Sequence, residues 1–449
     1  MELISDVNLD IKQRIKRIAL SIEKNKVDGT ELIKVSKDCL STGADVDDIH
    51  DILELGHLSN VSRHISDQGL IEPWFDLLVQ MIERSNYNLG YILKQRSKRY
   101  ASKVAFKLLD KGNLKVLTYD ALWSLIIEVG RSLSQLDINQ KTPTIGILSH
   151  NQLNGVLVDL ACLSFGYRII PLPLNASPHH ISYIVEHSDI THLFLGGEIG
   201  NKIWNELHKE TKIKTISLDN VEKSIESINW DLFLELGDQA TDFNINKQLT
   251  TVDIKNTQSI MYTSGTTDNP KGITFNQINM ISKRFGRALA LPNIGSNDVF
   301  LCYLPLYHTF GRYFELMGSI FWGATYSFAE SPAFNSLLND FKIIKPTIFI
   351  SIPKRWVQLY EMLDSNLELD SDDSSIIKIK LNDITGGSLK WGLSAAGYLD
   401  PDIFIFFQDN GINMLSGYGM TEATGGITMT PPNDYKPDSV GTALPGIKL

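Results

Sequence analysis

Short apolar runs alternate with amphipathic segments over most of this 449-residue chain, from about residue 88 onward. Apolar side chains recur at helical spacing between Leu122 and Leu136. Other apolar runs are short and bounded by turn residues, as strands are: 144–148, 169–174, 193–196, 299–304, 347–352 and 414–417. Alternation of this kind indicates parallel sheets covered by helices. The sequence therefore predicts an α/β fold built from two such sets, the second beginning near Ser259.

The first 87 residues have a different pattern. They place apolar residues at helical spacing between polar breaks such as 28–30, and the acidic stretch 45–48 before Ile49 is typical of a helix start. We expect four or five short helices, forming an all-helical N-terminal extension over residues 1–87. Because this segment has no glycine-rich loop and no cluster of titratable residues, a packing or oligomerisation role is favoured over a catalytic one.

Composition restricts the partners and the compartment. Lys and Arg number 42 against 52 Asp and Glu, which gives a net charge of −10 and argues against nucleic-acid binding. No window approaches the roughly 18 uncharged apolar residues of a membrane span, and the N-terminus does not resemble a signal peptide. The odd number of widely spaced cysteines predicts reduced core thiols: Cys39, Cys162 and Cys302. We expect a cytoplasmic protein with at most peripheral membrane contact.

The stretch from Tyr262 to Gly272, YTSGTTDNPKG, follows an apolar run and combines hydroxyls, glycines and one lysine. Glycine lets backbone N–H groups approach an anion, Ser and Thr add donors, and Lys adds a mobile charge. The stretch is not a Walker loop, because Gly272 rather than Ser or Thr follows Lys271. A bare cluster of this composition is more often a surface turn without a ligand. The order of its residues nevertheless predicts a loop that holds polyphosphate.

That order, TSGTTxxPKG, resembles the phosphate-binding signature of the AMP-forming acyl-CoA synthetases, the adenylate-forming family. Three further family-like elements follow in the expected order: YLPLYHTFGR at 303–312, ITGGS at 384–388 and GYGMTE at 417–422. The resemblance covers about residues 88–449. It implies two helix-covered, mostly parallel sheets and a small β-rich subdomain. We expect the divisions at 88–255, 256–425 and 426–449.

The resemblance implies ATP-dependent activation of a carboxylic acid to an acyl adenylate with release of pyrophosphate. The acyl group would then pass to a thiol, that of CoA or of a carrier protein's phosphopantetheine. ATP and Mg²⁺ would be the cofactors. The β- and γ-phosphates would be held by a mobile lid made of Thr263, Ser264, Gly265, Thr266, Thr267 and Lys271.

The GYGMTE element would hold the rest of the nucleotide, along Gly417, Tyr418, Gly419 and Met420. By resemblance, Tyr418 would cover the adenine, Thr421 would donate to the α-phosphate, and Glu422 would hold Mg²⁺, a hard ion suited to one carboxylate with waters and phosphate oxygens. Gly387 and Ser388 would lie at the edge of the base and at the floor of the acyl pocket. Taken alone, the element could be an ordinary strand-to-helix turn with Thr421 as the N-cap.

His308 has two interpretations. A histidine between Pro-Leu-Tyr and Phe310 is often a satisfied core residue, whereas the resemblance implies that it faces the substrate carboxylate. A metal role is poorly supported, because none of the other nine histidines has a ligand spacing with it.

The branch of the family, and with it the kind of acyl group, is indicated only by less specific sequence features. Arg312 and the segments 328–331 and 351–356 look like the long-chain fatty acyl-CoA ligase branch, which implies a hydrophobic tunnel. The connection 360–383 is short for that branch, and carboxylic acid reductase adenylation domains and fatty acyl-AMP ligases share similar features. A different class is also open: a nucleotide- or acyl-binding module with little or no turnover. A third possibility is a structural scaffold dominated by the helical extension, and such a protein would show no thermal stabilisation by ATP.

The last residues, 441–449, resemble the family's VGxPLPGxxV strand. In the family a ribose-binding aspartate, a hinge and a C-terminal lid domain with a reactive-site lysine come after this strand. We therefore expect this segment to bind nucleotide far better than it turns over, with its end a fragment boundary or with a partner supplying the rest. The oligomeric state and the acyl chain length stay open.

Asp268 stands where the family usually has glycine. A carboxylate about 6 Å from a phosphate would cost ~2 to 3 kcal/mol at an effective dielectric of 20, before Lys271 and Mg²⁺ offset it. Replacing Asp268 by Gly is therefore expected to lower the KM for ATP, measured by pyrophosphate exchange. An unchanged or higher KM would contradict this prediction.

Overall fold

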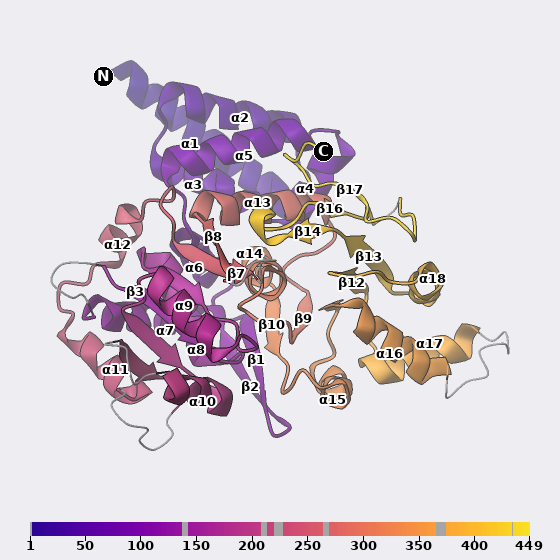
Figure 1. The fold of residues 1–449 in the computed structure, drawn as a ribbon. Coiled ribbons are helices and arrows are strands. Elements are labelled where there is room, and N and C mark those ends of the chain that lie inside the picture. The colour runs from indigo at the N-terminus through magenta and orange to yellow at the C-terminus, as the bar shows by residue number, and fades with distance from the viewer. Residues whose placement is uncertain are drawn as a thin grey trace.

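The computed structural model describes residues 2–136, 142–207, 213–219, 228–263, 269–364, 374–432 and 434–449, with side chains from Asp10 onward. Two large sheets form its centre (Figure 1). The strands of the seven-stranded sheet are β1 (Val104–Asp110), β2 (Asn113–Thr118), β9 (Val299–Cys302), β10 (Thr325–Phe328), β11 (Ile348–Ser351), β12 (Trp391–Ala395) and β13 (Asn413–Gly417). Those of the six-stranded sheet are β3 (Thr144–Leu148), β4 (Arg168–Pro171), β5 (His192–Leu195), β6 (Lys214–Ser217), β7 (Ser259–Thr263) and β8 (Lys271–Phe275).

The spatial orders are β13-β12-β11-β9-β10-β1-β2 and β6-β5-β3-β4-β7-β8. Only the edge pairs β1–β2 and β7–β8 are antiparallel among the described strand pairs of these sheets. The α/β fold with mostly parallel sheets, predicted from the alternation of apolar runs, is confirmed.

The two sheets do not divide at residues 255 and 256, where the sequence division was expected. β7 and β8 follow that point but complete the six-stranded sheet, whereas β1 and β2 come first in the chain and join the seven-stranded sheet. β1 pairs with β10, placing Phe106 opposite Tyr326. An apolar run shows that a strand forms but not which distant strand it pairs with, since pairing is decided by packing across the fold.

The helices of this α/β part are α6 (Leu89–Arg99), α7 (Tyr119–Ser134), α8 (Leu153–Phe165), α9 (Pro178–His187), α10 (Gly197–Leu207), α11 (Trp230–Leu236), α12 (Ile245–Thr251), α13 (Gln277–Ala290), α14 (Met317–Trp322), α15 (Phe334–Ile344), α16 (Pro353–Asp364), α17 (Ser374–Thr385) and α18 (Pro401–Asp409). A π-helix, η3 (Phe310–Leu316), runs directly into α14. Residues 155–165 of α8 are all buried, as expected for a helix that is largely apolar around its circumference apart from Asp159.

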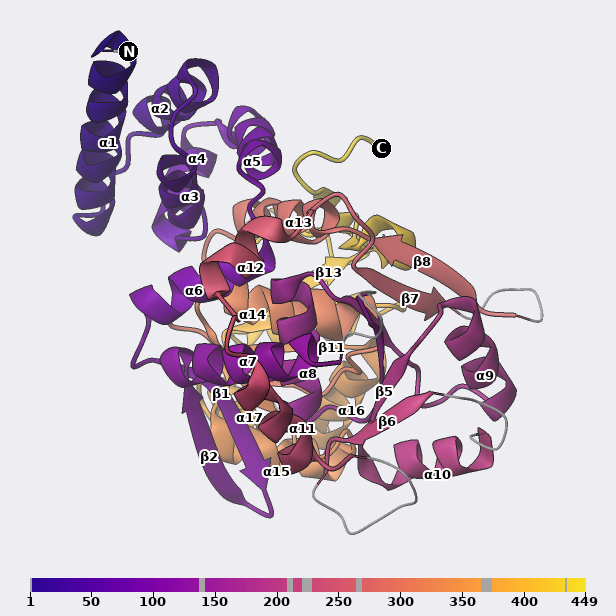
Figure 2. The same cartoon turned by 90° about the vertical axis from the view of Figure 1, so that its left-hand side faces the viewer.

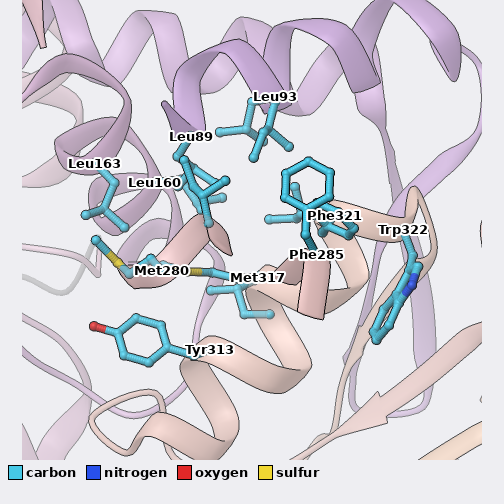
Figure 3. Close-up of a cluster of buried hydrophobic side chains, with 14 of the residues drawn as sticks. Leu89, Leu93, Leu160, Leu163, Met280, Phe285, Tyr313, Met317, Phe321 and Trp322 are labelled. Atoms are coloured by element: carbon cyan, nitrogen blue, oxygen red, sulfur yellow. The ribbon is translucent and has the colours of Figure 1, made fainter. Parts of the chain in front are cut away.

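Side chains of α6, α8, α13, η3 and α14 meet in one apolar cluster (Figure 3). The labelled members are Leu89, Leu93, Leu160, Leu163, Met280, Phe285, Tyr313, Met317, Phe321 and Trp322. Each is at most 7% exposed. This cluster fixes α13 and η3, two helices whose other residues reach the cavity described below.

The N-terminal extension folds into α1 (Glu2–Glu23), α2 (Gly29–Thr42), α3 (Val46–Leu55), α4 (Ser59–Asp67) and α5 (Ile71–Ser85). These helices lie together at one corner of the α/β part (Figure 2). α4 and α5 contact α13, and the carboxylate of Glu72 accepts a hydrogen bond of 3.3 Å from the Gly446 N–H. The predicted all-helical character is confirmed, although α1 is longer than the short helices expected. The limits of this extension and of the subdomain at 426–449 stay predictions.

Near the end of the chain, two small antiparallel pairs join β14 (Gly419–Met420) with β15 (Gly425–Gly426), and β16 (Thr428–Met429) with β17 (Thr442–Ala443). The three cysteines are buried and free, and burial raises the pKa of Cys39 to about 12, so all three are core thiols as predicted. Within the described ranges, no helix is both long and apolar enough to cross a lipid bilayer.

Candidate active site

A cavity of about 410 Å³ opens at the carboxyl ends of β12 and β13. The strand register pairs Ala395 with Gly417, and both residues line the cavity. Thr263, the last residue of β7, contributes from the six-stranded sheet. The cavity therefore lies where the carboxyl ends of strands from both sheets meet, the usual position for ligands in open α/β sheets.

A second cavity, of about 490 Å³, adjoins the first. Its wall includes the segment after β4, from Pro173 to Ser177, together with Pro270 just before β8. Four residues line both cavities: Thr263, His308, Thr309 and Thr421. These four residues, called here the junction, mark the place where two groups bound in the two cavities would meet.

Most of the residues predicted from the sequence lie together in the first cavity. The members that line it are Thr263, His308, Gly417, Tyr418, Gly419, Met420, Thr421 and Glu422. Glycine is required at Gly419, because a Cβ there would lie 2.2 Å from the carbonyl oxygen of Gly425 on β15. The Tyr418 side chain is 53% exposed beside this tight strand pair. A half-exposed aromatic ring on a cavity wall is suited to stacking on a nucleobase.

Thr421 begins a single turn of 3₁₀-helix, η4 (Thr421–Ala423). Met420, not Thr421, occupies the N-cap position, so the interpretation of Thr421 as a capping residue is wrong. Thr421 instead lines both cavities. A hydroxyl at this point can donate to an anion bound at the junction.

Glu422 is exposed on the cavity wall directly after Thr421. The described residues hold no group of three or more His, Cys, Asp and Glu side chains that could enclose a metal ion. Mg²⁺ differs from zinc in this respect, since it commonly binds to one or two carboxylates and takes its other ligands from phosphate oxygens and water. A single carboxylate on the cavity wall is therefore compatible with Mg²⁺, which Glu422 would hold together with phosphate oxygens and water.

His308 is positioned by its own loop. Its Nδ1 accepts the backbone N–H of Phe310 at 3.2 Å, so the neutral ring carries its proton on Nε2. Desolvation by the surrounding walls lowers the pKa of His308, although the residue is open to both cavities. The ring is therefore neutral at physiological pH and can donate one hydrogen bond to an anionic substrate oxygen. This geometry favours a substrate-facing histidine over a satisfied core residue.

Gly387 and Ser388 do not lie where the resemblance implied. Residues 374–385 fold as helix α17, and the two residues follow it in the turn before β12, at the amino end of that strand. The cavity lies at the opposite, carboxyl end, where it is lined by Ala395 and Ala396. Gly387 and Ser388 therefore do not line the cavity, and Ala395 and Ala396 of the segment at the end of β12 form that part of its wall. The apolar run ending in Ser394-Ala395-Ala396-Gly397 could have indicated this from the sequence.

The phosphate loop is described only at its two ends. Ser264, Gly265, Thr266, Thr267 and Asp268 lie outside the described residues. The ends are held together, because Thr263 pairs with Lys271 across the antiparallel strands β7 and β8. Lys271 is exposed and lines neither of the two cavities, so its contact with phosphate stays a prediction.

Arg312 has a structural role instead of a place in the cavity. It is fully buried, and its Nε donates to Oδ2 of Asp159 on α8 at 2.8 Å while Nη2 donates to Oδ1. Its Nη1 donates to the hydroxyl of Ser259 on β7 at 2.6 Å. The Asp159 carboxylate raises the pKa of Arg312 against the opposing effect of burial. Arg312 thus ties η3 to the base of the strand that ends at Thr263.

Sequence reasoning missed part of the wall. Phe310, Phe314 and Met429 form apolar surface, and Arg287 of α13 adds a buried guanidinium. Phe310 lies two residues after His308, so the loop motif could have pointed to it. Arg287 had no such signal, because a basic residue in a helical segment is usually solvated.

Comparison with known proteins agrees with the fold and the motifs. A sequence model of the family described as AMP-binding enzyme matches residues 93–449. Fatty acyl-CoA synthetase A of Dictyostelium discoideum is 29% identical over 378 residues, which cover 76% of this chain and 55% of that protein. Long chain acyl-CoA synthetase 7, peroxisomal, of Arabidopsis thaliana is 25% identical, covering 75% and 52%. The chain thus spans about half the length of these curated relatives.

Solved structures show the same fold at lower identity. The complex of the anthranilate CoA ligase AuaEII with anthranoyl-AMP has a TM-score of 0.64 at 20% identity, covering 80% of this chain and 65% of that one. The complex of VinN with L-aspartate has a TM-score of 0.65 at 18% identity, covering 80% and 83%. With the family match extending from α6 to the last residue, the chain belongs to the AMP-binding enzyme family of adenylate-forming proteins.

Proposed function

We propose that this chain activates a carboxylic acid with ATP, forming an acyl adenylate and releasing pyrophosphate, before the acyl group passes to a thiol. The observation that carries the proposal is the junction. Thr421 and His308 line both cavities there, beside Glu422 and the first residue of the phosphate loop, Thr263. A nucleotide along the GYGMTE wall of the first cavity and an acid along its apolar wall would meet at these side chains.

Each residue has a task that follows from its position. Tyr418 would stack on the adenine, and the Thr421 hydroxyl would donate to the α-phosphate as negative charge develops there. The His308 Nε2–H would hold the attacking carboxylate in line. Glu422 would hold Mg²⁺, which when bound offsets the charge of the phosphate oxygens. Most of the acceleration expected here comes from positioning and from preorganised donors.

Fatty acids with CoA as the acceptor are the favoured substrates within this proposal. The names of the Dictyostelium and Arabidopsis relatives specify acyl-CoA synthetases, and Phe310, Phe314 and Met429 supply apolar surface. A carrier-protein phosphopantetheine is the alternative acceptor. A cytoplasmic location remains part of the proposal, and one relative is named as peroxisomal.

A second candidate function is a binding module with little or no turnover. It is favoured by Asp268, which puts a negative charge into the sequence that would hold the β- and γ-phosphates. The two functions differ in whether pyrophosphate is released and not in whether nucleotide binds.

Acid-dependent exchange of labelled pyrophosphate into ATP tests the proposal, with a panel of monocarboxylic, dicarboxylic and aromatic acids. We expect exchange that requires both an acid and Mg²⁺. Thermal stabilisation by ATP or by an acyl-sulfamoyl adenosine, measured in parallel, reports binding alone. Stabilisation without exchange for any acid would favour the binding module. The absence of both stabilisation and exchange would contradict both candidates.

A further inference from the structure

Arg287 places a buried cation in the wall of the first cavity. It lies in the last turn of α13, is 2% exposed, and its guanidinium carbon stands 4.2 Å from the centroid of the Phe314 ring. Two glycines make room for it. A Cβ at Gly425 or Gly426 would lie 2.8 or 3.2 Å from Arg287 Nη2. The guanidinium therefore fills space that side chains on β15 would otherwise occupy.

This cation has no anionic partner among the described residues. Its Nε and Nη1 are buried without a hydrogen bond, and no carboxylate lies within salt-bridge distance of it in the part of the chain that the structure describes. Burial lowers the pKa of Arg287 to about 9. The nearby Lys283 adds a like charge, since its ammonium donates to the carbonyl oxygen of Gly426 at 3.0 Å. A buried, unpaired guanidinium is costly, and a bound anion would remove that cost.

The position of Arg287 indicates which anion it can reach. The reacting carboxylate belongs at the junction, beside His308 and Thr421, because those residues line both cavities. Arg287, Phe314 and Met429 line only the first cavity. Arg287 packs on the Phe314 ring, so a group bound to it lies at the apolar wall, along which the part of the acid that extends away from the reacting end would run.

We propose that Arg287 binds a second carboxylate on the acyl group, so that the site selects dicarboxylic acids over monocarboxylic acids of equal length. A planar guanidinium can bind a carboxylate in bidentate geometry, which is why Arg suits the recognition of a carboxylate better than Lys does. An unsubstituted alkyl chain would leave the buried charge unpaired, whereas the Phe314 and Phe310 rings can pack on the methylene groups between the two carboxylates. This inference rests on the proposed function and narrows its substrate class from fatty acids to diacids.

Matched acid pairs test the inference on the chain itself: hexanoate with adipate, octanoate with suberate, and decanoate with sebacate. Pyrophosphate exchange gives kcat/KM for each acid, and calorimetry gives its Kd. We expect the wild type to prefer the diacid of at least one pair. Arg287→Met should lose about 10- to 100-fold of that preference, the usual effect of removing a hydrogen bond to a charged group.

Two further variants make the result specific. Arg287→Lys keeps the charge and should retain part of the diacid preference, and Arg131→Met removes an exposed arginine of α7 and should retain all of it. Because Arg287→Met removes an unpaired buried charge, its thermal midpoint should equal or exceed that of the wild type. A lower midpoint together with an unchanged acid preference would assign Arg287 to the fold and overturn the inference.

The failure of this inference differs from that of the proposed function. Exchange with monoacids that equals exchange with diacids, and that Arg287→Met does not alter, would overturn the diacid site and leave adenylation intact. The absence of exchange with every acid would contradict the proposed function. In that case the calorimetric Kd values still decide, because diacid binding weakened by Arg287→Met supports the site and equal binding of both acid classes overturns it.

Discussion

Replacing Thr421 by alanine should lower the maximal rate of acid-dependent pyrophosphate exchange by about 10²- to 10³-fold, the usual effect of removing one preorganised transition-state donor. Thr421 lies at the junction, where it lines both cavities. Thr421 does not cap η4, so its removal should leave the local backbone intact. The loss should therefore appear in kcat more than in the KM for ATP, because the donor acts on charge that develops during the reaction.

The matched control is Thr241→Ala, which removes a hydroxyl from an exposed residue after η2 (Gly237–Gln239). It should leave exchange unchanged. Steady-state exchange at varied ATP separates kcat from KM, and circular dichroism checks that both variants are folded. A loss below about tenfold for Thr421→Ala, or an equal loss for Thr241→Ala, would contradict the assignment of Thr421 to the α-phosphate.

Replacing Asp159 by alanine should destabilise the protein by about 3–5 kcal/mol, because it leaves the Arg312 guanidinium buried without its counter-charge. Arg312 is fully buried and donates twice to the Asp159 carboxylate. Its remaining hydrogen bonds, to the hydroxyls of Ser259 at 2.6 Å and Tyr313 at 3.4 Å, cannot neutralise the charge. Denaturant unfolding followed by tryptophan fluorescence measures the effect.

The double variant Asp159→Leu with Arg312→Met tests whether charge pairing or packing makes this site sensitive to substitution. Removing both charges leaves apolar side chains of similar size, so the double variant should be close to the wild type in stability and far more stable than Asp159→Ala. A double-mutant cycle gives the coupling energy between the two residues. If the double variant is as unstable as the single one, packing and not charge pairing makes this site sensitive.

The motifs that lie within continuous segments could be predicted from the sequence. GYGMTE forms the end of β13, the strand β14 and the turn η4, and each of its residues lines the first cavity. These local geometries depend on neighbouring residues, as the close approach of Gly419 to Gly425 shows. His308 is similar, because its Nδ1 is oriented by the N–H of Phe310 in the same loop.

The motif resemblance was wrong for the segment ITGGS, because its residues alone do not specify where the segment lies relative to a strand. ITGGS resembled a family element beside the base and the acyl pocket, but Ile384 and Thr385 complete helix α17, and the glycines form the turn that follows. Both Gly386 and Gly387 have positive φ, 77° and 74°, which glycine adopts equally at the end of a helix or in a tight turn. A glycine pair therefore identifies a turn without showing which end of a strand lies beside it.

The sequence by itself determined the α/β class, the helical extension, the family and the local shape of the GYGMTE and His308 segments, because each follows from periodicity or from neighbouring residues. Only the tertiary structure decided that β1 and β2 cross to the other sheet, that Arg312 is neutralised by Asp159, and that Arg287 has no counter-charge at the cavity wall among the described residues. Strand pairing and charge compensation join residues that are more than a hundred positions apart in the chain, as Arg312 and Asp159 are. Such contacts are selected by the packing free energy of the whole fold, which no local pattern contains.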